Sequence, residues 1–159
     1  MSFPVVSIRS LRVFRSVMFA CTLLLSACTP GSADDGIAVL EPWIRETPPG
    51  RTVAAGYMQL RNDGNESRVL VGARSPEASR MELHSMRHED GMMRMRQEES
   101  IVIKGGATVA LEPGGLHLML FDIETAAAGH RVPVVLEFED GWEIELSVPV
   151  RRANGGHQH

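Results

Sequence analysis

Short extended segments separated by turn residues run through most of this chain and constrain its fold more than any other feature. From residue 37 to residue 150, stretches of alternating character end at clusters of Gly, Pro, Asn and Asp. No helical period of useful length competes with them. The pattern predicts an all-β fold, an antiparallel sandwich or barrel. Strands are expected at 37–45, 54–61, 67–74, 79–88, 92–97, 100–103, 107–111, 116–121, 131–138 and 142–150.

The first 27 residues predict a secretory signal and not a part of the fold. They contain three arginines, no acidic residue and then an apolar run of twelve residues, 16–27. That run is too short to span a bilayer, which takes about 20 residues, but it is typical of a signal peptide. It ends in Leu25-Ser26-Ala27-Cys28, which resembles a bacterial lipobox. We therefore expect cleavage before Cys28, lipidation of that cysteine, and a lipid-anchored protein of the periplasm or cell envelope.

The remaining chain is predicted to contain one folded domain. Removing 27 of the 159 residues leaves 132, a size at which one hydrophobic core is expected. Residues 28–36 predict a flexible tether, residues 37–152 the domain, and residues 153–159 a disordered tail. This mature chain keeps 13 basic against 20 acidic residues, a formal charge of −7, which argues against nucleic acid as a partner.

Sulfur in the mature domain comes from methionine alone. Cys21 lies in the predicted signal and Cys28 is the predicted anchor, so no disulfide, cysteine zinc site or redox dithiol is expected. Six of the seven methionines after residue 27 lie between Met81 and Met119. Thioether sulfur is a soft ligand and imidazole is borderline, and together they suit Cu(I) better than zinc, calcium or magnesium. The composition of this region therefore predicts a copper site.

Two histidines and two methionines are the candidate ligands. They are His84, Met95, His117 and Met119, separated by ten, twenty-one and one residues. Side chains alternate between the two faces of a strand, so His117 and Met119 share the face opposite to the leucines around them. In the same way, His84 shares a non-leucine face with Met86. Two separate strands thus present a histidine and a methionine on one face.

A tight turn at Asp90-Gly91 predicts a hairpin between two of these strands. A two-residue loop would place Met86 directly opposite Met95, with His84 one diagonal step away. A slip of one residue would move Met95 to the other face. Met86 is therefore kept as a reserve ligand.

The four candidate ligands and their surroundings resemble the PCuAC family of bacterial copper chaperones. The resemblance covers residues 37–150 and implies a cupredoxin-like β-sandwich that binds one Cu(I) near its surface through His84, Met95, His117 and Met119. It also implies delivery of copper outside the cytoplasm to the copper site of cytochrome c oxidase subunit II, alongside a thiol-bearing partner chaperone. Matching segments include Pro42-Trp43-Ile44-Arg45, Ala54-Ala55-Gly56-Tyr57-Met58, Met93-Arg94-Met95-Arg96 and Glu112-Pro113-Gly114-Gly115-Leu116.

Ligand exchange, not catalysis, is the predicted activity. No nucleophile–base arrangement or other enzyme signature is found in the sequence, and an electron-transfer cupredoxin needs a cysteine ligand. Two alternatives stay open: a lipoprotein for adhesion or envelope assembly whose His/Met cluster is incidental, and a copper storage or resistance protein. In the tail, His157 and His159 form a candidate Cu(II) site or belong to a disordered end.

Overall fold

Ten β-strands build the part of the chain that the computed structural model describes, residues 36–89 and 91–152. Every predicted strand is present, and each observed boundary lies within one residue of the expected one. These residues contain no helix, and so none that could cross a membrane. The strands are β1 (Ile37–Arg45), β2 (Val53–Asn62), β3 (Arg68–Arg74), β4 (Arg80–Glu89), β5 (Met92–Glu98), β6 (Ile101–Ile103), β7 (Thr108–Leu111), β8 (Leu116–Phe121), β9 (Arg131–Phe138) and β10 (Glu143–Arg151).

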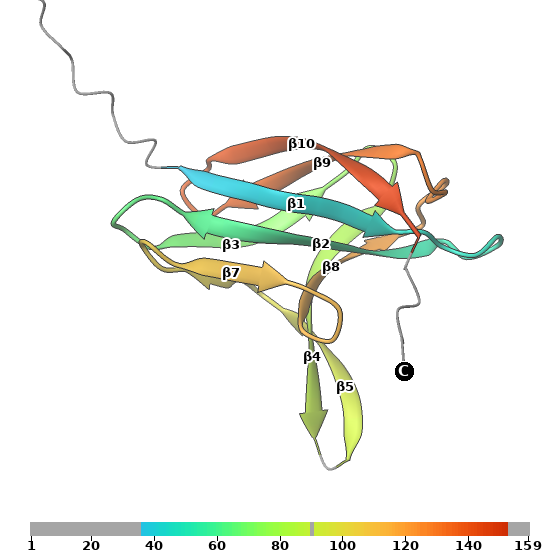
Figure 1. The fold of residues 1–159 in the computed structure, drawn as a ribbon, viewed down its shortest axis with the longest axis horizontal. Coiled ribbons are helices and arrows are strands. Elements are labelled where there is room, and N and C mark those ends of the chain that lie inside the picture. Colours follow the sequence, from blue (N-terminus) through green and yellow to red (C-terminus); the bar gives the residue numbers. More distant parts are fainter. Residues whose placement is uncertain (1–35, 90, 153–159) are drawn as a thin grey trace, which may run out of the picture. The chain divides into compact units, whose positions relative to one another are not determined.

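The strands follow the order β5-β4-β8-β7-β2-β1-β10-β9-β3-β6 (Figure 1). Most neighbours are antiparallel, but β1 runs parallel to β10, and β7 runs parallel to β8. The contact between β1 and β10 is short, with Ile44 opposite Val150 and Arg45 opposite Arg151. It joins the half of the fold that contains β8 to the half that contains β9. The predicted all-β sandwich is confirmed, with two parallel contacts added to the antiparallel pattern.

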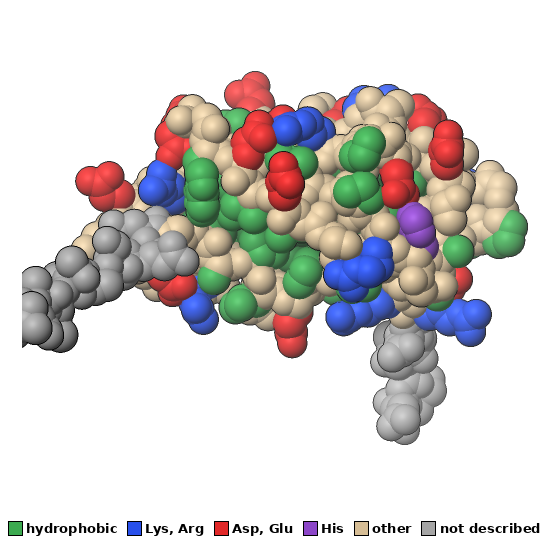
Figure 2. All heavy atoms as spheres, turned by 90° about the horizontal axis from the view of Figure 1, so that it is seen from above, with side chains coloured by type: hydrophobic (Ala, Val, Ile, Leu, Met, Phe, Trp, Pro, Cys, Tyr) green, Lys and Arg blue, Asp and Glu red, His purple; other side chains and the backbone are tan. Residues whose placement is uncertain are grey.

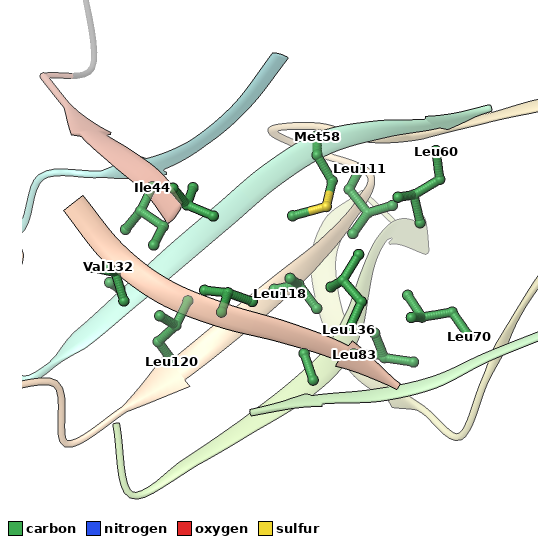
Figure 3. Close-up of a cluster of buried hydrophobic side chains, with 14 of the residues drawn as sticks. Ile44, Met58, Leu60, Leu70, Leu83, Leu111, Leu118, Leu120, Val132 and Leu136 are labelled. Atoms are coloured by element: carbon green, nitrogen blue, oxygen red, sulfur yellow. The ribbon is translucent and has the colours of Figure 1, made fainter. Parts of the chain in front are cut away.

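The hydrophobic core lies between these two halves. Leu118 and Leu120 of β8 are almost fully buried, as the alternation in the sequence predicts. Figure 3 shows them gathered with Val132 and Leu136 of β9. Because β8 turns its leucines inward, its other side chains lie on the outer face of the sheet.

An irregularity in β1 brings Trp43 to that outer face. Leu40 pairs with Gln59 and Trp43 pairs with Tyr57, so β1 has one more residue than β2 between these pairs. Glu41 accommodates the bulge with a positive φ of 49°. A bulge reverses the alternation of a strand, and Ile44 consequently points into the core while Trp43 lies against Tyr57 on the outer face.

Charged side chains of both signs lie on the face that Figure 2 shows. One group of ion pairs links β3 to β9 and β10: Arg74 contacts Glu137 at 2.7 Å and Glu143 at 2.8 Å. The hydrogen bond from Arg74 lowers the pKa of Glu143. The predicted signal, the lipidation site Cys28 and the tail histidines His157 and His159 lie outside the described residues.

Candidate metal centre

The pairing of β4 with β8 brings the two predicted histidines together. His84 lies directly opposite His117, and their ring centroids are 5.9 Å apart. The neighbouring pair, Leu83 and Leu118, points into the core. Both imidazoles therefore lie on the outer face. His117 is nevertheless only 3% exposed, because other side chains of that face cover it.

Met95 reaches the same face through the β4–β5 hairpin. Met86 is directly opposite Met95, and Glu89 is opposite Met92, which leaves a two-residue loop as the sequence predicted. Gly91 in this loop has a φ of 78°, a conformation that favours glycine. The register places Met95 one diagonal step from His84. Met95 is 48% exposed, so it forms the open side of the site.

Met119 completes the group from β8. It follows His117 on the outer face and lies opposite Glu82, one diagonal step from His84. Side chains on such diagonals are about 7–8 Å apart at their Cα atoms, within reach of long side chains. The structure thus brings all four predicted residues to one patch on three adjacent strands. Among the described residues, no group of three or more His, Cys, Asp or Glu side chains is placed to hold a metal ion.

Each histidine has one ring nitrogen engaged and one left with its lone pair. His117 Nδ1–H donates to the carbonyl oxygen of Gly115 at 3.0 Å, which leaves Nε2 as the acceptor. His84 Nε2–H donates to Oε2 of Glu82 at 2.8 Å. The remaining Nδ1 of His84 is buried and has no hydrogen-bond partner in the described part of the chain. An unsatisfied buried acceptor costs about 1–3 kcal/mol, and a metal ion would satisfy it.

Glu82 fixes the orientation of His84. Its other carboxylate oxygen accepts a hydrogen bond from Nε of Arg80 at 2.9 Å. The guanidinium of Arg80 in turn stacks on Phe121, 3.8 Å from the ring centroid. The hydrogen bonds from His84 and Arg80 lower the pKa of Glu82, so this side chain stays an acceptor. Sequence reasoning missed Glu82, although its position two residues before His84 places it on the same strand face.

Aromatic side chains cover the other flank of His117. Tyr57 lies 6.4 Å from His117 and 4.7 Å from Trp43 between ring centroids. Burial raises the pKa of the Tyr57 phenol, so that group stays protonated. This cover was also missed, because it depends on the pairing of β2 with β8 and, for Trp43, on the bulge in β1. The site is therefore closed beside β2 and open beside β5.

Sequence comparisons identify relatives along most of the chain. The profile of the family described as "Putative lipoprotein LpqE-like" matches residues 37–150. "Putative lipoprotein Lxx21020" of Leifsonia xyli subsp. xyli is 34% identical over 142 residues, which cover 88% of this chain and 84% of the relative. "Uncharacterized protein RP573" of Rickettsia prowazekii is 28% identical over 127 residues, with 77% and 70% covered.

Solved structures with the same fold include two that hold copper. One is described as the copper-bound PCuAC domain from PmoF2: 26% identity, a TM-score of 0.61, and 73% of this chain and 92% of that domain covered. The other is the Cu(I) form of DR1885 from Deinococcus radiodurans: 28% identity, a TM-score of 0.56, with 75% and 77% covered. The cupredoxin-like PCuAC fold predicted from the sequence is thereby confirmed. The chain belongs to the LpqE-like lipoprotein family and has the fold of a PCuAC domain.

Proposed function

We propose that this protein is a copper chaperone that binds one Cu(I) ion through His84, Met95, His117 and Met119. The observation that carries the proposal is that His84 and His117 lie directly opposite each other, with each methionine one diagonal step from His84 on the same side of the sheet. Two neighbours of the same fold are described as copper-bound. The donor chemistry agrees, because thioether and imidazole together suit Cu(I).

In this proposal the nitrogen donors are Nδ1 of His84 and Nε2 of His117, the two atoms that carry free lone pairs. All four ligands are then neutral, and the thioethers release no proton when they bind. Copper is the cargo of the protein and not a catalytic cofactor, and the protein is no enzyme. Its activity is the transfer of the ion to another protein.

Transfer proceeds by ligand exchange at the open side of the site. The exposed Met95 is the ligand that an acceptor replaces first, while the buried His117 holds the ion until other bonds have formed. Thiolates bind Cu(I) more tightly than neutral thioethers, so transfer to a cysteine-containing acceptor is downhill. We propose that the acceptor is the copper site of cytochrome c oxidase subunit II, reached alone or through a thiol-bearing partner chaperone.

The same proposal places the protein in the periplasm or cell envelope, held to a membrane by a lipid on Cys28. This location agrees with the lipoprotein family to which the chain belongs. Metabolic labelling with a fatty acid tests the anchor: the protein should carry the label, and Cys28→Ser should abolish it. An unlabelled wild-type protein would refute lipidation without affecting the copper site.

A competition titration tests the copper site directly. Anaerobic Cu(I) is added to residues 36–152, which contain the ten strands and the core, in the presence of a coloured Cu(I) chelator. The wild-type protein should retain one tightly bound equivalent, and His117→Ala or Met119→Leu should lose it. The matched control is Met58→Leu, a methionine of the core that is not on the outer face. Equal retention by all these variants would refute the site.

The rival functions predict other results in the cell. A protein for adhesion or envelope assembly would bind no tight copper in the titration above. A storage or resistance protein would bind it, but its deletion would lower copper tolerance without changing cytochrome c oxidase. A chaperone for the oxidase predicts that a deletion strain grown in low copper has less copper and less activity in that enzyme.

A further inference from the structure

The β4–β5 hairpin extends beyond the other strands (Figure 1). It carries thioethers that the proposed centre does not use, among them those of Met86 and Met93. His88 lies directly opposite Met93, one step further along the hairpin than the pair of Met86 and Met95. Alternation along β4 places His88 on the same face as Met86 and His84. A row of imidazole and thioether groups therefore continues from the proposed centre towards the hairpin loop.

Packing does not explain this row. Met93 is 52% exposed, and nearly all of β5 is open to solvent. Methionine usually fills gaps in a core, but the outer part of a solvent-exposed hairpin has no core to fill. A face of thioethers there costs solubility and contributes little to stability, so a binding role is the better explanation.

The opposite face of the hairpin is organised differently. It carries the arginines at positions 87, 94 and 96 and two glutamates that pair with them. Glu89 contacts Arg96 at 2.9 Å and Arg94 at 3.8 Å, and Glu98 contacts Arg87 at 3.4 Å. These ion pairs are what is expected of a face that is in contact with solvent, and they need no bound ligand to explain them. Three arginines against two glutamates also leave a small positive charge, which disfavours a divalent cation more than a monovalent one.

We propose that Met86, His88 and Met93 form a second site for Cu(I), on the hairpin, with Met95 shared between this site and the first. Directly opposite residues have their Cβ atoms about 4.5–5.5 Å apart, close enough for two side chains to hold one ion between them. Successive pairs on one face are about 7 Å apart. The flexible side chain of Met95 can therefore turn towards either site.

The second site binds more weakly than the first, because its ligands are exposed and only one of them is an imidazole. It extends the proposed function, and rests on it, by supplying the place where copper arrives and leaves. An acceptor that contacts the hairpin would meet the ion there before reaching His117. The absence of a carboxylate among the ligands, together with the positive charge behind them, makes the site selective for Cu(I) over Zn(II).

The test uses residues 36–152, which leave out His157 and His159, with ¹³C-labelled methionine methyl groups. Anaerobic Cu(I) is added beyond one equivalent while the methyl resonances are followed. The first equivalent should shift Met95 and Met119, and the second should shift Met86 and Met93. Met93→Leu should weaken the second equivalent by about tenfold or more, the scale on which even indirect partners of a ligand act.

Met92→Leu is the matched control, because Met92 is 55% exposed on the charged face of the same hairpin. Its variant should bind both equivalents as the wild type does. One equivalent bound with an unshifted Met93 methyl, or equal binding by the two variants, would overturn the second site and leave the proposed function intact. Retention of the tight first equivalent by His117→Ala, with Met93 still shifting at the second, would instead refute the four-ligand centre and leave the second site intact.

Discussion

Removing the carboxylate of Glu82 should weaken Cu(I) binding although Glu82 is not itself a proposed ligand. In the structure this carboxylate receives Nε2–H of His84 at 2.8 Å and thereby leaves Nδ1 bare. Without it, the proton can move to Nδ1, which blocks the donor, and the ring can turn. Loss of such a partner typically costs about 10–100-fold in metal affinity, and we expect Glu82→Ala to fall within this range.

Glu82→Gln separates hydrogen bonding from charge. Its amide oxygen can still accept from Nε2–H, so the affinity should recover most of the loss seen in Glu82→Ala. Nitrogen-15 spectra of the metal-free protein provide a reading that does not depend on copper. They should show His84 protonated at Nε2 in the wild type and in Glu82→Gln, and a mixture of tautomers in Glu82→Ala.

The chain offers a matched control at a second histidine. His130 contacts Glu77 through Nε2 and Oε2 at 2.7 Å, nearly the same geometry as at His84. Glu77→Ala should leave the affinity for Cu(I) unchanged. Cu(I) binding by Glu82→Ala as tight as that of the wild type, or an equal loss of affinity in both alanine variants, would refute this role of Glu82.

Three further outcomes are expected. Exchanging Arg94 and Met95 keeps the composition but moves the thioether to the other face of β5, so the affinity for Cu(I) in the competition titration should fall, as we also expect for Met95→Leu. Leu120→Ala empties a fully buried position and should lower the free energy of unfolding by about 2–5 kcal/mol in urea denaturation. Glu143→Gln should destabilise the fold at neutral pH, because Arg74 lowers the pKa of this carboxyl below its ordinary value of 4.5. A group whose pKa is lowered in the folded state stabilises the fold at pH values above its ordinary pKa, and this stabilisation is lost as the pH falls through the pKa of the folded state. The difference in the free energy of unfolding between Glu143→Gln and the wild type should therefore vanish in acid.

The two stability predictions each have a control and a contrary result. The control for Leu120→Ala is Val102→Ala at an exposed position, which should change the free energy of unfolding little. If Leu120→Ala lowered the free energy of unfolding no more than Val102→Ala does, the packing of Leu120 would be contradicted. The control for Glu143→Gln is Glu145→Gln, which changes an exposed residue of the same strand for which no ion pair is found in the described part of the chain. A deficit that persists unchanged in acid at position 143, or one of equal size at 145, would contradict the ion-pair explanation.

The strands and the hairpin register could be predicted because they depend on local signals. Alternating leucines identify the core face of β8, and Asp90-Gly91 determines the length of the loop that places Met95 opposite Met86. Contacts between strands that lie far apart in the sequence could not be predicted from such local signals. The cover that Tyr57 provides for His117 depends on the pairing of β2 with β8, two strands far apart in the sequence. Trp43 joins this cover through the bulge at Glu41, which reverses the alternation of β1 and leaves no clear periodic signal.

The candidate centre lies at one end of the strand order, and this position suits the transfer of copper to another protein. Exposure of the proposed ligands rises from β8 to β5: His117 is 3% exposed and Met95 is 48% exposed. A buried ligand has few alternative partners and holds an ion in place, whereas an exposed thioether exchanges readily with an incoming group. The two ends of the site should therefore control different quantities. Substitution of His117 should lower the affinity, while substitution of Met95 should also raise the rate at which copper leaves, and stopped-flow transfer to a coloured chelator would separate the two effects.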